Sequence, residues 1–199
     1  LCDLGDFSMG SEDAVHATLR AVVTQINKIG ACAVILGGSD HLSEKVQGAL
    51  PMCQTAQLGG KPRDASGFHI APVSESTTLT KTSNSARQLT ELTEWRNTSR
   101  PLFVRFDLSV FETSLSALCD QPRLGGYDLD TVSHWLSALG QLDVSAIMLT
   151  GLNPSRPGMG VVKVGQRLMV TALLAFIYAR LGFGIIPPTR QISKESVTT

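Results

Sequence analysis

The chain has 199 residues, of which 43% are apolar, and it carries 17 basic and 17 acidic side chains. A chain of this length buries one substantial core without disulfides or metals, so we expect a single domain over residues 1–199. Zero net charge without a Lys/Arg cluster argues against binding to nucleic acid or to an anionic membrane, and small-molecule or metabolite partners fit better.

Four cysteines, Cys2, Cys32, Cys53 and Cys119, lie far apart and form no C-x-x-C pair. This spacing suggests neither a zinc site nor a disulfide framework, so we interpret them as reduced thiols of a cytoplasmic protein. The opening "LCDLGDF" has no initiator Met, basic region or apolar stretch of a signal peptide. We therefore expect that residues upstream are missing.

The first predicted elements are a helix and a strand. Apolar residues recur at helical spacing from Val15 to Ile29, after Ser11 as N-cap and before Gly30. The strand over residues 31–36 is apolar at every position, which is typical of a parallel strand covered on both faces. The stretch 53–83 is rich in Gly, Ser, Thr and Pro without clear periodicity, and we predict loops there.

Helices and strands then alternate. We predict a helix over 84–95, a strand over 101–106, a helix over 130–139 and a strand over 144–149. A final helix covers 161–182, and its apolar core of about 12 residues is shorter than the roughly 20 that span a bilayer. This alternation indicates an α/β fold with three layers, a parallel sheet flanked by helices.

Three segments follow the predicted strands at their carboxyl ends, where ligands bind in such sheets: "GGSDH" after Leu36, "DLSVFE" after Phe106 and "TGLNPSR" after Leu149. Each has an ordinary structural explanation. A Gly-Gly pair makes a tight turn, an Asp at a strand end caps a helix, and Asn-Pro starts a turn. No one of these motifs is specific alone.

Taken together and in order, "LGGSDHLS", "RFDLSVFE", "GGYDLDTV" and "LNPSRPG" resemble the ureohydrolase family of arginases, agmatinases and formiminoglutamases. The Asn-Pro-Ser form and the long last helix most resemble arginase. The resemblance covers residues 1–60 and 100–184. It implies a parallel α/β fold with a two-manganese cluster, whose hydroxide hydrolyses a guanidinium carbon. Because the family needs more β-α units than residues 53–100 supply, we expect that parts of the middle are missing.

The family's metal-ligand patterns are altered in this chain. At GGDHS the chain reads GGSDH, so in ungapped register Asp40 takes the place of the metal-binding His and His41 lies one residue too late. A slip of one residue changes where a side chain points. At SxDxDxxDP, Asp107 matches the first ligand but Ser109 replaces the second, and a hydroxyl has neither the charge nor the bridging capacity of a carboxylate.

Other family positions are also changed. DAHxD has no equivalent: "DASGF" at 64–68 follows no strand, and the alternative register places Cys53, Thr55 and Gln57 there. "SGFHIAPVS" at 66–74 resembles the family's SGNxHGxPVS with one residue deleted, which implies that His69 is a substrate-side catalytic histidine. An exposed loop histidine is the ordinary alternative. The acidic residue that the family places before Asn-Pro falls on Gly151.

Three hypotheses remain open from the sequence. In the first, the chain is a ureohydrolase-fold pseudoenzyme that binds no cofactor, with vestigial ligand positions Asp40, His41, Asp107 and Ser109. In the second, it is an active Mn²⁺-dependent hydrolase of guanidino or amidino C–N bonds. In the third, it is an unrelated α/β protein whose Gly-Gly turn binds phosphate. The family resemblance and the apolar last helix also predict a homotrimer or a multiple of it.

Overall fold

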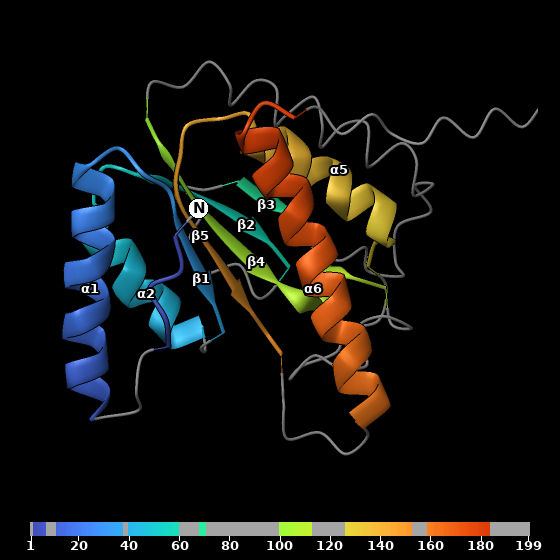
Figure 1. Ribbon diagram of the computed structural model, residues 1–199, viewed down its shortest axis with the longest axis horizontal. Helices are drawn as coiled ribbons and strands as arrows, with labels where there is room; N and C mark the ends of the chain where they lie inside the picture. The colour runs from blue at the N-terminus through green and yellow to red at the C-terminus, as the bar shows by residue number, and fades with distance from the viewer. Residues whose placement is uncertain are drawn as a thin grey trace, which may run out of the picture.

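The computed structural model describes residues 2–6, 11–37, 40–59, 68–70, 100–112, 126–152 and 159–183. Five strands form one sheet in the order β1-β5-β4-β2-β3, and every neighbouring pair is parallel (Figure 1). The strands are β1 (Ala33–Leu36), β2 (Gln54–Leu58), β3 (Phe68–Ile70), β4 (Leu102–Asp107) and β5 (Val144–Thr150). The prediction of a parallel sheet is confirmed.

Helices cover both faces of this sheet. The pair α1 (Glu12–Lys28) and α2 (Asp40–Ala49) lies on one face, and the pair α5 (Leu129–Gly140) and α6 (Met159–Arg180) lies on the other (Figure 1). The three-layer α/β prediction is therefore confirmed. A short 3₁₀ helix, η1 (Leu108–Val110), follows β4 directly. No helix in the described ranges is long and apolar enough to cross a membrane.

The helix starts follow from local capping. The Ser11 hydroxyl accepts a hydrogen bond from the Ala14 amide at 3.4 Å, and the Asp128 carboxylate accepts one from the Thr131 amide at 2.8 Å. Gly30 follows α1 with a φ of +72°, a conformation that glycine adopts without steric cost. The helices predicted from Ser11 and over 130–139 are confirmed, with bounds that differ by a residue or two.

The strand β1 differs from its prediction. It begins at Ala33 rather than at residue 31, and the side chains of Val34 and Leu36 are 37% and 64% exposed. Both faces were predicted to be covered, but β1 is the terminal strand of the described sheet and pairs with β5 alone there. The strand that is buried at every position is β5, which lies between β1 and β4.

The prediction of loops over residues 53–83 is wrong for two segments, because β2 and β3 both lie within it. The sequence of β2, "QTAQL", has a weak strand signal of its own. Pairing with β4 on one side and β3 on the other overrides this local preference. The helix predicted over 84–95 lies outside the described residues.

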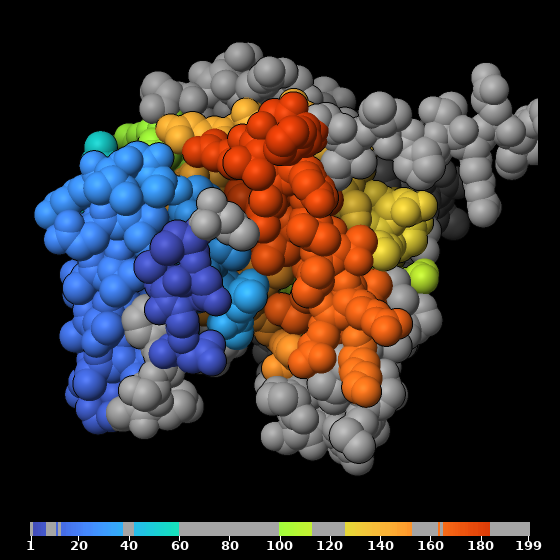
Figure 2. Space-filling view, in the orientation of Figure 1, coloured from blue at the N-terminus to red at the C-terminus, as the bar shows by residue number. Residues whose placement is uncertain are grey.

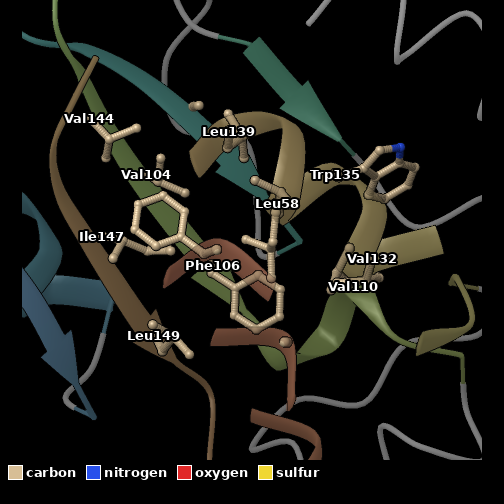
Figure 3. Packing of buried hydrophobic residues seen from close by; sticks show 14 of the residues in the cluster. Leu58, Val104, Phe106, Val110, Val132, Trp135, Leu139, Val144, Ile147 and Leu149 are labelled. Atoms are coloured by element: carbon tan, nitrogen blue, oxygen red, sulfur yellow. The ribbon is translucent and has the colours of Figure 1, made fainter. Parts of the chain in front are cut away.

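The larger core lies between the sheet and the pair α5 and α6. Figure 3 shows side chains of β4 and β5, among them Val104, Phe106 and Ile147, directed toward this layer. The Tyr127 and Trp135 rings meet edge to face there, with centroids 4.5 Å apart. On α6, Met169 and Phe176 are buried in this core. Leu168 and Ala172 of the same helix are buried too.

Candidate functional site

The carboxyl ends of four strands meet at one edge of the sheet. Pairing aligns Leu36 with Leu149, Leu149 with Phe106, and Phe106 with Leu58 in a single row across the strands. The residue that follows each of these four positions belongs to a second row, in which Asp107 pairs with Thr150. This row consists of Gly37, Thr150, Asp107 and Gly59. Ligands of open parallel sheets bind beyond such a row, so this edge is the candidate site.

Asp107 supplies the carboxylate of this row, and both of its oxygens accept hydrogen bonds. Its extended backbone ends β4 and caps η1, with the Ser109 amide donating to Oδ1 at 2.8 Å. The Thr150 hydroxyl of β5 donates to Oδ2 at 3.2 Å. Thr150 and Ser109 are buried, and Asp107 is half-buried. The carboxylate therefore joins the turn after β4 to the end of β5.

Glycines with positive φ follow three of the strands at this edge. Gly37, Gly59 and Gly151, with φ values of +90°, +74° and +89°, follow β1, β2 and β5. A Cβ at Gly151 would lie 2.9 Å from Asp107 Oδ2 and 3.1 Å from both Cγ and Oδ1. A Cβ at Gly59 would lie 2.7 Å from the carbonyl oxygen of Asp107 and from the amide nitrogen of Val110. The chain thus packs backbone, without side chains, on two sides of Asp107.

The structure places the residues that the sequence selected as follows. Asp107 and Ser109 lie together at the edge, bonded through the Ser109 amide. Asp40 and His41 are the first residues of α2, which begins shortly after β1 ends. His69 lies in the middle of β3 and pairs with Gln57 of β2. The side chains of Asp40, His41 and His69 lie outside the described part, so their roles stay predictions.

The alternative registers for the missing pattern DAHxD are also placed. Thr55 and Gln57 lie within β2 rather than beyond its carboxyl end, where a ligand loop would start. Of the segment 64–68, only Phe68, the first residue of β3, is described. At the level of Asp107, the residue that β2 contributes is Gly59.

A two-manganese cluster needs several carboxylates and imidazoles that converge on one point. Within the described residues, no three His, Cys, Asp or Glu side chains come together to hold a metal ion. At the row where the strands end, Asp107 has two glycines and a threonine as its companions. The described side chains of this edge do not fit the cluster that the family resemblance implies.

The sequence indicated Gln57 only in an alternative metal-ligand register and Thr150 only as part of the segment "TGLNPSR", and it did not indicate Gly59. The Gln57 side chain is buried and donates from Nε2 to the Gly59 carbonyl oxygen at 3.0 Å, which holds the turn that leaves β2. Recognising β2 as a strand would have placed this turn at the candidate site. Thr150 directly precedes Gly151. A hydroxyl residue at the last position of a buried strand was the sequence signal that could have indicated it.

A buried cationic residue lies two rows below Asp107. Arg105 in β4 is only 6% exposed and pairs with Gln57 on β2 and Met148 on β5. Side chains alternate between faces along a strand, so Arg105 lies on the same face as Phe103, which packs with α1 and α2. The polar part of the site thus borders the layer formed by α1 and α2.

No protein-family model matches the chain, and no curated protein sequence matches it either. Solved structures do match. The agmatine ureohydrolase of Thermoplasma volcanium superposes with a TM-score of 0.67 at 14% identity, over 92% of this chain and 74% of that one.

Two further structures agree. The formimidoylglutamase of Bacillus subtilis gives a TM-score of 0.66 at 15% identity, over 89% of this chain and 71% of that one. An oxidized formiminoglutamase of Trypanosoma cruzi, determined with Mn²⁺, gives 0.66 at 16% identity, over 89% and 73%. The likeness lies in the backbone far more than in the sequence, and it establishes that this chain has the α/β/α fold of the ureohydrolases.

Proposed function

We propose that the chain is a ureohydrolase-family protein that has lost its manganese centre and acts as a binding, regulatory or structural subunit. The fold and the order of the family-like motifs support the family assignment. The observation that carries the loss of the centre is Ser109, which is buried beside Asp107 where the family pattern has a second carboxylate.

The chemistry of this replacement favours loss of hydrolysis. Two Mn²⁺ ions hold and activate a bridging water only if anionic oxygen ligands neutralise part of their charge. A serine hydroxyl is neutral and does not replace a bridging carboxylate. Gly151, at the family's acidic position before Asn-Pro, also provides no negative charge for a guanidinium substrate. Both the metal and a cationic substrate thus lose partners at this edge.

The direct test is elemental analysis of the protein after purification in excess Mn²⁺ and removal of free metal, together with an assay of urea release from arginine. We expect less than one Mn²⁺ per chain and no urea. An active agmatinase treated in the same way, with agmatine as its substrate, is the positive control for metal recovery and urea detection. Two tightly held Mn²⁺ ions with measurable turnover would contradict the proposal.

The second candidate function is an active Mn²⁺-dependent hydrolase of guanidino or amidino C–N bonds. The observation in its favour is that Asp107 stands at the carboxyl edge and that α2, which begins with Asp40 and His41, starts after a neighbouring strand. In that case Asp40, His41 and Asp107 would hold metal, and His69 would act on the substrate side. Stoichiometric Mn²⁺ in the analysis above selects this function.

We further propose that the chain assembles as a homotrimer or a multiple of it, in the cytoplasm. Three apolar side chains spaced four residues apart on α6, Val170, Leu174 and Tyr178, are 54%, 40% and 47% exposed. They form an outward stripe on a helix that lies at the surface of the molecule (Figure 2). A second copy of the chain would remove this apolar surface from water.

Light scattering tests the assembly. We expect the mass of three chains or a multiple at micromolar concentration, and a smaller particle for Leu174→Glu. Ala21→Glu, at an exposed position of α1 on the opposite face of the sheet, is the control and should keep the assembly. A strictly monomeric wild-type chain would contradict this proposal without bearing on the metal centre.

A further inference from the structure

We infer that Asp107 has become a structural carboxylate that fills the space a side chain at position 151 needs, so that an acidic residue restored at 151 would disturb this edge rather than complete a substrate site. This inference rests on the proposed function, because it explains why the retained carboxylate is not a remnant ligand. It concerns two positions that meet across the neighbouring strands β4 and β5.

Hydrogen bonds hold the Asp107 carboxylate in place. Oδ1 accepts from the Ser109 amide within η1, and Oδ2 accepts from the Thr150 hydroxyl on the neighbouring strand. The Thr150 hydroxyl has a single proton and lies 3.5 Å from the Phe106 carbonyl oxygen, so the nearer carboxylate oxygen is its better acceptor. A backbone amide and a buried hydroxyl thus hold the carboxylate in one orientation.

The Asp107 carboxylate also occupies space beside position 151. In this orientation, three atoms of the Asp107 carboxylate lie within 3.1 Å of the point that a Cβ at position 151 would occupy. The contact with Oδ2, at 2.9 Å, requires the carboxylate to shift, and a shift weakens the hydrogen bonds that hold it. Gly151 also has a φ of +89°, which a residue with a Cβ adopts only with strain. A side chain at 151 therefore fits only at the cost of the hydrogen bonds of Asp107.

The cost of the backbone conformation can be measured apart from the cost of the contact with Asp107, because the chain contains a matched control glycine. Gly37 has a φ of +90° at the end of β1 in the same row, but a Cβ there would meet no atom within 4 Å. Substitution of Gly37 by Ala thus measures the cost of the backbone conformation alone. Substitution of Gly151 by Ala measures that cost plus the contact with Asp107.

The experiment is a mutant cycle of urea-induced unfolding with a chelator present, so that metal plays no part. Gly37→Ala should lower the folding equilibrium constant about tenfold, and Gly151→Ala should lower it about a hundredfold or more. In an Asp107→Ala background, Gly151→Ala should cost only about as much as Gly37→Ala. Thr150→Val should cost about fivefold in the wild type and almost nothing in the Asp107→Ala background.

Equal costs of Gly151→Ala in both backgrounds would overturn the inference. If Asp107→Ala does not fold, Asp107→Ser replaces it, because serine keeps an acceptor near the Ser109 amide and lacks the two outer oxygens. The same two tests then apply in the Asp107→Ser background.

A second measurement uses glutamate in place of alanine, again with a chelator present. Gly151→Glu should cost more stability than Gly37→Glu, and equal costs of the two substitutions would overturn the inference. If the wild type itself binds two Mn²⁺ ions, the proposed function fails. The chelated cycle can still show the coupling between residues 107 and 151, so failure of the proposed function is distinguishable from failure of the inference.

Discussion

The two edges of the sheet are built in different ways. At the amino edge, side chains from both helical layers form hydrogen bonds near the start of β5. Asn27 of α1 is hydrogen-bonded to Ser145. Arg180 of α6 donates to the carbonyl oxygens of Leu142 and Val144. At the carboxyl edge, the bonds of Asp107 and Thr150 join neighbouring strand ends, and glycines follow three of the strands.

This difference shows which edge holds the layers together and which one carries the site. Bonds between layers at the amino edge join α1 and α6 to the start of β5, independently of the other edge. The carboxyl edge is where α/β folds bind ligands, and among the described side chains of its terminal row Asp107 is a carboxylate with local hydrogen bonds. A chain can therefore lose the chemistry of one edge while the opposite edge keeps the fold.

The largest expected effect comes from a glycine pair with one member at each edge. Gly59 and Gly30 have nearly equal φ values of +74° and +72°, but a Cβ at Gly59 would meet backbone at 2.7 Å and one at Gly30 would meet nothing within 4 Å. We expect Gly59→Ala to destabilise the fold by about 3–5 kcal/mol and Gly30→Ala by about 1–2 kcal/mol. Urea denaturation of both variants measures the difference.

Equal losses for the two glycine variants would mean that the backbone conformation alone decides the cost. The close approach of β2's turn to the Asp107 carbonyl would then have no energetic weight, and the carboxyl edge would be more tolerant of side chains than its geometry indicates. In that case Gly59→Asp would be a feasible way to add a carboxylate next to Asp107.

The next effect tests the bonds between layers at the amino edge. Arg180→Met keeps much of the apolar stem but removes the guanidinium that bonds the Leu142 and Val144 carbonyl oxygens. We expect a loss of about 1.5–3 kcal/mol in the free energy of unfolding, because charge-assisted bonds to backbone are lost. Arg167→Met, at an exposed position of the same helix, should change stability by less than about 0.5 kcal/mol.

Much of the fold was predictable from the sequence, for identifiable reasons. The helix α1 carries a cap, an apolar stripe and a terminal glycine, so local and tertiary signals agree. The strands β4 and β5 are central and nearly wholly apolar, which is why "PLFVRF" and "VSAIML" were recognised. The prediction missed β2 because Gln54, Thr55 and Gln57 give it a polar sequence. The strand is stabilised by pairing with its two neighbours instead.

The candidate site was predictable only in part. The positions of Asp107 and Ser109 follow from β4 and from the family-like pattern. The contact between Asp107 and Gly151 joins residues 44 positions apart and depends on the register of two strands, which a single sequence does not specify. Thr150 became a partner of Asp107 through the same register. Sequence patterns thus select residues, while strand pairing determines which of them meet.

The smallest effect concerns Cys32, which lies just before β1 at the amino edge. Burial raises the pKa of its thiol from 9.0 to about 11; Arg180 lowers the pKa and Asp143 raises it, each by less than burial does. Burial also raises the pKa of Cys53, which immediately precedes β2. At both positions the protein favours the neutral thiol. The exposed Cys2 should therefore be alkylated before Cys32 and Cys53 at mildly alkaline pH.

The sign of the pH effect follows from this shift. Because the folded chain holds the Cys32 proton more tightly than the unfolded chain, the thiol contributes stability that is fully present below pH 9. That contribution is lost as the pH rises from about 9 toward about 11. Other groups titrate in the same range, so the informative quantity is the difference between the wild type and Cys32→Ala. Urea denaturation between these pH values should show a smaller decline for Cys32→Ala. If the free energies of unfolding of the wild type and of Cys32→Ala declined in parallel, the Cys32 thiolate would be tolerated at the amino edge. The bonds between layers would then not exclude charge from this edge.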